Sequence, residues 1–238
     1  MHIEYITTID STNSELMRRA ARGEYESVCL VAQTQTAGRG RLGRAWLSNE
    51  QALTFSIGLA LSPQDWSGLS LVVGLCIAEQ LHERVQIKWP NDLWVDGCKL
   101  AGILIETATL PTSAARFCVI GVGINLQAPT ASAAAPFKTS AIGLQTLLPS
   151  VTPEQTLARI LQPLVDSIHH FAQHGFAPYA ARFASRDALQ GRRIELSSAA
   201  VQPSVQGQYL GINEQGALLL QTPAGLQTIM SHEVSVCF

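Results

Sequence analysis

Residues 35–46 read Gln-Thr-Ala-Gly-Arg-Gly-Arg-Leu-Gly-Arg-Ala-Trp, and this stretch decides how the rest of the chain is interpreted. Its arginines, Arg39, Arg41 and Arg44, each follow a glycine directly. Glycine permits positive φ and a close approach of a ligand to the main chain. Arginine supplies a permanent charge and a planar fork that fits phosphate or carboxylate. The stretch therefore predicts a loop that closes over an anion, and the alternative is a solvated basic surface loop.

Apolar segments on both sides of this loop favour the anion-binding interpretation. Residues 28–32 lead into the loop and residues 53–61 follow it, so two buried strands are expected to hold it. Residues 38–43 also match G-x-G-x-x-G, the dinucleotide fingerprint, which requires a helix directly after the turn. Because no helical apolar period develops before residue 53, we disfavour a nicotinamide site.

Length and composition limit the class of protein. A chain of 238 residues is long enough for one full domain and a smaller one. The net charge of −2 disfavours a large nucleic-acid footprint, which is usually strongly basic. Five cysteines without C-x-x-C spacing are typical of reduced thiols in a cytoplasmic protein. The start of the chain lacks signal-peptide features, and the longest apolar run, residues 71–78, is too short to cross a membrane.

A second informative stretch, residues 85–106, predicts a hairpin. Asp96-Gly97 lies between apolar runs, which indicates a two-residue loop. That register pairs Trp94 with Lys99. It also makes Asp92 the diagonal neighbour of Lys99, roughly 7–8 Å away on the same face.

Two lysines are expected on that face. Lys88 has the same parity as Asp92 and Lys99, unless Pro90 breaks the strand. One interpretation is a cross-strand ion pair facing solvent, which stabilises little. The strand of Lys99 is otherwise apolar, however, so the lysine should be partly buried with an anionic partner. Gly102 leaves room for a ligand beside the backbone.

The remaining segments alternate helices and strands. Thr12 and Glu15 fit a capping box for an N-terminal helix, and residues 69–84 predict a buried helix. In the apolar strand at residues 119–126, Gly121 and Gly123 are consistent with tight helix packing or with a groove floor.

The last third of the chain predicts helices followed by short strands. Residues 152–172 and 178–186 predict helices, and the short β-runs beyond residue 187 predict a small all-β barrel.

Several motifs together resemble those of the biotin protein ligases, also called biotin–[acetyl-CoA-carboxylase] ligases. They occur in the family's order and are Ser11-Thr12-Asn13, residues 35–46, Lys88-Trp-Pro-Asn-Asp92, Lys99-Leu-Ala-Gly-Ile-Leu-Ile-Glu106 and Gly121-Val-Gly-Ile-Asn125. The resemblance implies an α+β fold. Residues 1–187 would form a catalytic domain with a mixed sheet and helices, like that of class II synthetases, and residues 188–238 a C-terminal SH3-like β-barrel. It also implies a short form without the N-terminal DNA-binding domain of some relatives, since the first motif begins at residue 11.

The resemblance implies a two-step reaction. The carboxylate of biotin attacks the α-phosphate of ATP and gives biotinyl-5′-AMP and pyrophosphate. A lysine of a biotin carboxyl carrier protein then takes the biotinyl group. Biotin and ATP would be substrates and Mg²⁺ a cofactor, in a cytoplasmic enzyme that binds neither DNA nor membrane. The oligomeric state stays open between a monomer and a homodimer.

The resemblance also implies residue roles. Lys99 and Arg41 would be catalytic. Biotin would contact Ser11, Thr12, Asn13, Gln35, Gly38, Arg39, Gly40, Arg41, Lys99 and Gly102. The nucleotide would contact Arg39, Arg41, Trp46, Asn91, Asp92, Lys99 and Asn125, and the metal ligands are undetermined. Residues 127–139 lie where the family has a loop that orders over the adenylate.

Three other functions compete with this one. A lipoate or octanoyl transferase shares the superfamily and a similar lysine, but the glycine–arginine loop together with Lys88-Trp-Pro-Asn-Asp92 favours biotin. An arginine-rich nucleic-acid module is disfavoured by the acidic net charge. A biotin sensor without catalysis is disfavoured by the retained Lys99.

Overall fold

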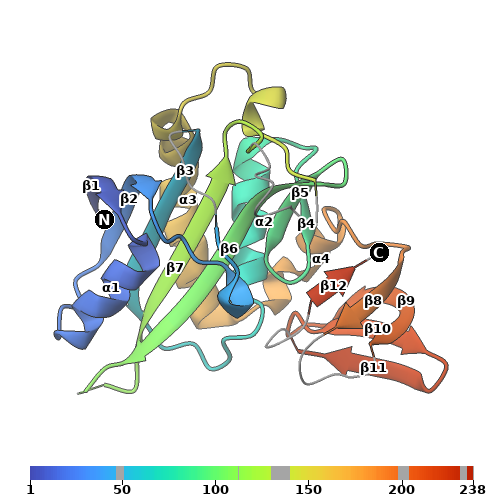
Figure 1. Ribbon diagram of the computed structural model, residues 1–238. Coiled ribbons are helices and arrows are strands. Elements are labelled where there is room, and N and C mark those ends of the chain that lie inside the picture. The colour runs from blue at the N-terminus through green and yellow to red at the C-terminus, as the bar shows by residue number, and fades with distance from the viewer. Residues whose placement is uncertain (47–50, 112, 130–139, 198–203, 231–234, 238) are drawn as a thin grey trace.

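The computed structural model describes residues 1–46, 51–111, 113–129, 140–197, 204–230 and 235–237, which form two β-sheets with helices (Figure 1). The larger, seven-stranded sheet has the order β1 (His2–Ile9), β2 (Val28–Gln35), β3 (Ala52–Leu61), β7 (Arg116–Asn125), β6 (Cys98–Thr109), β5 (Asp92–Val95) and β4 (Gln86–Lys88). The pair β1–β2 is parallel and the other neighbours are antiparallel. The predicted mixed sheet is confirmed.

Helices cover both faces of this sheet. One face carries α1 (Thr12–Ala21), and the other carries α2 (Leu69–Leu81) and α3 (Pro153–His174), which Figure 1 shows behind the strands. The short elements are η1 (Arg41–Gly43), η2 (Leu144–Thr146), η3 (Ala177–Tyr179) and α4 (Ala180–Ala184). The helix α2 is apolar almost all round because it is buried between the sheet and α3.

The alternation of side chains along β3 separates the two faces. Leu53, Phe55 and Ile57 belong to the main core with α2 and α3. Thr54 and Ser56 point to the opposite face, where α1 lies, and both are buried. The α1 face therefore presents polar groups at positions where the other face presents a hydrophobic core.

The start of α1 differs from the expected capping box. The N-cap is Ser11, whose side chain accepts a hydrogen bond from the Ser14 backbone N–H, and Thr12 is already the first helical residue. Glu15 pairs instead with Arg18 and Arg19. The prediction that Thr12 and Glu15 form the box is wrong because Thr12 is engaged in the sheet-facing hydrogen bonds described below.

Beyond residue 187 the chain forms the second sheet. Its antiparallel strands have the order β11 (Gly225–Ile229), β10 (Leu218–Thr222), β9 (Val205–Ile212), β8 (Arg193–Ser197) and β12 (Ser235–Cys237). The predicted β-rich C-terminal unit is confirmed. Within the described residues no pairing joins β11 to β12, so closure into an SH3-like barrel, like the boundary after residue 187, stays a prediction.

The two sheets contact one another through hydrogen bonds. The Trp89 indole Nε1 donates to the Gly216 carbonyl at 3.0 Å, and Lys88 Nζ donates to the Val236 carbonyl at 2.7 Å. The Tyr209 hydroxyl donates to the buried Asp187 carboxylate at 2.6 Å. None of the described helices combines the length and hydropathy that a membrane span requires.

Candidate active site

A cavity of about 270 Å³ lies on the α1 face, beneath the loop of residues 35–46. Residues expected at the site that line it are Ser11, Thr12, Asn13, Gln35, Arg39, Gly40, Arg41, Trp46, Asn91, Asp92, Lys99 and Gly102. Ser197 and Val236 of the second sheet also line it. The sequence motifs, separated along the chain, therefore meet around one cavity.

Two expected residues lie outside the cavity wall but support it. Gly38 is at the base of the loop, where its carbonyl accepts from the Trp46 backbone N–H at 2.9 Å. A side chain at Gly38 would collide with the Trp46 carbonyl, so only glycine permits this closure. Asn125 is buried, and its Nδ2 donates to the Lys99 carbonyl at 3.4 Å. Asn125 thus holds the backbone of Lys99.

The loop itself is a compact turn. An isolated bridge joins Arg39 and Ala45, and between them η1 includes Leu42 with a positive φ of 56°. In the described residues the element that comes next after η1 is strand β3 and not an α-helix, so the dinucleotide fingerprint has no helix N-terminus to receive a pyrophosphate. The loop instead crosses in front of the sheet (Figure 1).

A bulge in β6 brings Lys99 to the cavity. The register pairs Trp94 with Lys99, as predicted, but it shifts beyond Leu93, so that Asp92 lies opposite Gly102. The extra residue lies on β6, where Leu100 and Ala101 are both buried. Lys99 therefore shares the cavity face with Gly102, although a regular strand would have placed them on opposite faces.

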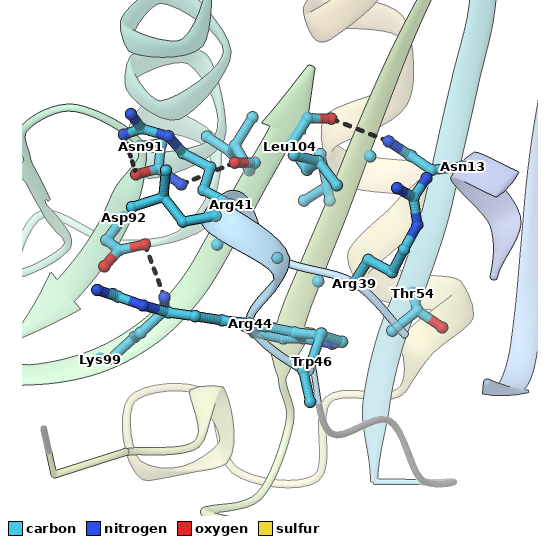
Figure 2. Close-up of a pocket in the computed structure, with 18 of the residues that line it drawn as sticks. Asn13, Arg39, Arg41, Arg44, Trp46, Thr54, Asn91, Asp92, Lys99 and Leu104 are labelled. Carbon is cyan, nitrogen blue, oxygen red and sulfur yellow. Dashed lines mark hydrogen bonds and ion pairs between the residues drawn. The ribbon is translucent and has the colours of Figure 1, made fainter. Parts of the chain in front are cut away.

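Lys99 forms an ion pair at the centre of the site. Its Nζ lies 2.7 Å from Asp92 Oδ1, with side-chain exposures of 30% and 19%, as Figure 2 shows. The expected partnership is confirmed, and the two side chains contact one another directly. The ammonium also lies 5.7 Å from the centroid of the Trp46 ring. A partly exposed ammonium beside open space can reach a further anion.

The arginines of the loop have different partners. Arg41 Nη1 donates to Asn91 Oδ1 at 3.2 Å (Figure 2), and burial lowers the pKa of its guanidinium, which Asp92 opposes. Arg39 Nη2 donates to both carboxylate oxygens of Glu106, at 2.9 and 3.1 Å. Arg44 is exposed. The loop thus places Arg41 above the Asp92 end of the cavity.

The opposite end of the cavity is neutral and polar. The Thr12 backbone N–H donates to Gln35 Oε1 at 2.8 Å, and Ser56 Oγ is 2.6 Å from both Thr12 Oγ1 and Asn13 Oδ1. The Asn13 Nδ2 donates to Glu106 Oε2 at 2.8 Å and to the Leu104 carbonyl at 3.3 Å. One end therefore binds through uncharged hydrogen-bonding groups and the other through charges.

Gly121 and Gly123 line the cavity floor, and Gly121 also packs against Asn13 of helix α1, so both sequence interpretations are confirmed. A side chain at Gly123 would collide with the indole of Trp46, and one at Gly121 with the amide of Asn13. The Trp46 Nε1 is buried without a hydrogen-bond partner among the described residues. A buried donor of this kind usually has an acceptor, which a ligand can supply.

Sequence reasoning missed several contributors. Ser56 is one polar residue in an apolar strand, and Glu106 follows the apolar run of β6, so each carried a weak signal. Lys88 was expected on this face, and it lines the cavity. Its Nζ lies 4.8 Å from the Trp94 ring centroid and donates a hydrogen bond to the Val236 carbonyl. The contribution of the second sheet had no local signal, because it depends on how the two sheets pack.

The cavity offers a donor set for a hard cation. Asp92 is the acidic side chain among the described residues that line it, and no described cluster of three or more His, Cys, Asp or Glu side chains is present. Magnesium at nucleotide sites takes one or two carboxylates together with substrate phosphates and waters. The residues present therefore fit a magnesium ion that is bound jointly with a polyphosphate.

The C-terminal end of the 127–140 segment is anchored beside Lys99. The Lys99 N–H donates to the Ser140 carbonyl at 2.8 Å, and the Ile142 N–H donates to the Lys99 carbonyl at 3.0 Å. Residues 130–139, where a covering loop was expected, lie outside the described residues.

Comparison with known proteins bears on this site. Residues 5–125 match the model of the Biotin/lipoate A/B protein ligase family, and residues 191–236 match the Biotin protein ligase C terminal domain. The chain is 34% identical to the Bifunctional ligase/repressor BirA of Escherichia coli over 241 residues, covering 98% of this chain and 74% of that protein. It is 34% identical to the Biotin--[acetyl-CoA-carboxylase] ligase of Paracoccus denitrificans over 237 residues, covering 94% and 96%.

A solved structure gives the same result at the level of the fold. The biotin protein ligase from Aquifex aeolicus, in complex with biotin and ATP, superposes with a TM-score of 0.82 at 28% identity, covering 99% of this chain and 98% of that one. The two family models match the two sheets separately, and the relatives match across both. This chain belongs to the biotin protein ligase family.

Proposed function

We infer that this chain is an ATP-dependent biotin–protein ligase that transfers biotin to a lysine of a biotin carboxyl carrier protein. The observation that carries this inference is the polarity of the cavity. Thr12 and Gln35 present neutral hydrogen-bonding groups at one end, and Lys99, Asp92 and Arg41 present charges at the other. Biotin has the same polarity, with a neutral cyclic urea at one end and a carboxylate at the other.

The first step joins two anions. A carboxylate oxygen of biotin attacks the α-phosphorus of ATP, and the bond from that phosphorus to the bridging oxygen of pyrophosphate breaks. Negative charge accumulates between the carboxylate and the phosphate, where the ammonium of Lys99 can contact both. Arg41 supplies a second cation from the loop. Asp92 would hold a magnesium ion, which would supply charge neutralisation at the phosphates.

The second step consumes the adenylate. The acceptor lysine amine attacks the carbonyl carbon of the mixed anhydride, the bond to AMP breaks, and the amine loses a proton. Until the carrier arrives, water must be kept from the anhydride. The loop of residues 35–46 is the described cover of the cavity, and its closed base at Gly38 and Trp46 supports that role.

Several finer features belong to the same proposal. Residues 1–187 act as the catalytic domain, and residues 188–238 close into an SH3-like barrel. The enzyme needs Mg²⁺, works in the cytoplasm and acts without binding DNA; homodimer formation is open. Biotin is contacted by the neutral end and by Gly102, and Trp46, Asn91 and Asn125 serve the nucleotide end.

A lipoate ligase is the competing function. Lipoate shares the carboxylate but lacks the urea, so it would not supply the N–H and C=O groups that complement the polar end of the cavity. The test is exchange of labelled pyrophosphate into ATP in the presence of either acid. Exchange that requires biotin supports the proposal, and exchange that lipoate supports equally well would replace it with the competing function.

A further inference from the structure

Asn13 lies across a row of three residues on the sheet. The strands β3, β7 and β6 place Ser56, Gly121 and Leu104 side by side. The Asn13 amide spans this row, with Oδ1 2.6 Å from Ser56 Oγ and Nδ2 3.3 Å from the Leu104 carbonyl, and Figure 2 marks the second contact. Asn13 and Ser56 are 4% and 0% exposed, so water does not satisfy these groups.

The partners of Asn13 fix the orientation of its amide. The Leu104 carbonyl and the Glu106 carboxylate can accept hydrogen bonds but cannot donate them. Glu106 Oε2 lies 2.8 Å from the Asn13 amide nitrogen. The atom that faces them must therefore be Nδ2, and Oδ1 must face Ser56. Because Oδ1 only accepts, the single proton of the Ser56 hydroxyl points to Asn13.

This orientation determines the direction of the next hydrogen bond. Thr12 Oγ1 lies 2.6 Å from Ser56 Oγ, and the Ser56 proton is already used. Two lone pairs at that distance would repel, so the Thr12 hydroxyl donates to Ser56. Gln35 Oε1 is the other acceptor near Thr12 Oγ1, but it is farther away, at 3.1 Å, and already receives the Thr12 backbone N–H.

The chain of bonds therefore runs in one direction, from Thr12 to Ser56 to Asn13 to Glu106. Its consequence is that the Thr12 hydroxyl, which lines the cavity, has lone pairs and no proton to offer a ligand. Ser11 has the opposite property. Its Oγ accepts the Ser14 backbone N–H at 3.3 Å as the helix cap, so its proton is available to the cavity. Adjacent residues thus present an acceptor and a donor.

We propose that Ser56 is a positioning residue that determines specificity for the cyclic urea, by holding the Thr12 hydroxyl as an acceptor for a ligand N–H. The proposal rests on the proposed function, since it names the groups of biotin, the urea N–H and carbonyl, that this end of the cavity binds. A urea places an N–H beside its carbonyl, which complements the acceptor of Thr12 and the donor of Ser11. In a ligand with an oxygen in place of that N–H, the lone pairs of this oxygen would face those of the Thr12 hydroxyl and repel them.

The test compares biotin with its two cyclic carbamate analogues, in which one or the other ring N–H is replaced by oxygen. In the wild-type protein, at least one carbamate should have a KM higher than that of biotin by about tenfold to a hundredfold. In Ser56→Ala, the short 2.6 Å contact is lost, and only the longer contact to Gln35 Oε1, at 3.1 Å and already engaged by the Thr12 backbone N–H, competes for the Thr12 proton. The Thr12 hydroxyl can then turn and donate to the ligand, so this ratio should fall to about threefold or less.

A matched control separates specificity from stability. Thr156 of α3 is as buried as Ser56, its hydroxyl donates to the carbonyl of the N-cap Thr152, and neither residue lines the cavity. Thr156→Val removes this buried hydroxyl and should leave the carbamate-to-biotin ratio at its wild-type value. Thermal melting monitors the fold of each variant. If Ser56→Ala does not fold, Ser56→Cys retains the size with a much weaker donor, and the ratio should fall there instead.

Two results would overturn the inference. One is a wild-type ratio retained by a folded Ser56→Ala or Ser56→Cys protein. The other is a wild-type protein that uses biotin and both carbamates equally well. In both cases the wild-type protein activates biotin, so the proposed function stands. A wild-type protein without biotin-dependent exchange instead removes the proposed function, and this inference with it.

Discussion

At the residue scale, Lys99 has the environment that charge stabilisation requires. It is a partly buried ammonium, paired with Asp92 at 2.7 Å and adjacent to Gly102, where a side chain would crowd the ammonium. A compact ammonium can touch two anions at once, and charge builds between carboxylate and phosphate only as their bond forms. The ammonium should therefore stabilise the transition state more than the bound substrates.

The first prediction follows from that difference. Lys99→Ala should lower the kcat of biotin-dependent pyrophosphate exchange by about 10²–10³-fold, or roughly 3–4 kcal/mol. Lys99→Arg should restore little, because a planar fork does not fit the position of the ammonium. Melting temperature controls for folding. Near-normal exchange by a folded Lys99→Ala protein would reduce Lys99 to a structural partner of Asp92.

Arg41 gives a second prediction at this scale. It covers the charged end through its bond to Asn91, so its loss should weaken retention of the adenylate more than its formation. Arg41→Gly should release free biotinyl-5′-AMP faster and increase biotinylation of unrelated added proteins several-fold, on the order of 10-fold. Chromatography of the released nucleotide measures this. Unchanged release together with unchanged carrier selectivity would show that Arg41 is not part of the cover.

At the element scale, strand register separates what the sequence predicts from what it does not. The Asp96-Gly97 turn correctly pairs Trp94 with Lys99, because a two-residue loop fixes register. The bulge that follows is not encoded by a turn signal. It arises where Leu100 and Ala101 are both buried, and it turns Lys99 to the face of Gly102. The lysine was identified from its chemistry, but its geometry needed the packed sheet.

The start of α1 shows the same limit. Ser11, Thr12 and Glu15 all suit a helix N-terminus, so local sequence leaves the cap ambiguous by one residue. The sheet decides between them, since Ser56 and Gln35 engage Thr12 and leave Ser11 to cap. Ser56 itself was not recognised, because one serine in an apolar strand has no partner that sequence alone can name.

The third prediction concerns the electrostatics of α1. The hydrogen-bonded Arg18 guanidinium lowers the pKa of Asp10, just before the Ser11 cap, from 3.8 to about 2. A lowered carboxyl pKa means that the pair stabilises the fold above pH 3.8 and that this contribution disappears as the pH falls toward 2. Because the pair is largely exposed, it should contribute about 1 kcal/mol or less.

Urea unfolding between pH 2 and 7 checks this in wild-type protein and in Asp10→Asn, at about 0.02 M and 0.5 M salt. The difference between the two proteins should be present at neutral pH, shrink below about pH 4 and diminish at high salt. A difference that is constant across pH would assign the effect to hydrogen bonding rather than to charge.

At the scale of the whole molecule, the second sheet contributes directly to the site. Its residues Ser197 and Val236 line the cavity. The Val236 carbonyl accepts a hydrogen bond from Lys88 of β4, which is paired with Asp92 of β5. The Tyr209–Asp187 bond lies at the junction, where residue 187 also forms a bridge with Ile87. The two units should therefore unfold together rather than separately.

The fourth prediction tests this junction. Burial raises the pKa of Asp187, and the Tyr209 hydroxyl partly offsets that rise by stabilising the carboxylate. Tyr209→Phe should lower the free energy of unfolding by about 1–3 kcal/mol at neutral pH. A raised carboxyl pKa favours the folded state most when the group is protonated, so the loss should be smaller near pH 4 than at pH 7.

Tyr5→Phe serves as the matched control, because Tyr5 is 62% exposed, and it should change stability by less than about 0.5 kcal/mol. Urea unfolding at the two pH values gives both comparisons. A Tyr209→Phe protein as stable as wild type, or one whose loss grows on acidification, would contradict the role given to this bond.

The central claim is that one cavity activates biotin with ATP and passes it to a carrier lysine. The most direct measurement is the intact mass of an apo biotin carboxyl carrier domain after incubation with this protein, ATP, Mg²⁺ and biotin. The account predicts one biotinyl group on one carrier lysine, dependent on ATP and formed at least about a hundredfold more slowly by a folded Lys99→Ala protein. An unmodified carrier in the presence of folded wild-type protein, or a carrier modified by lipoate in place of biotin, would contradict it.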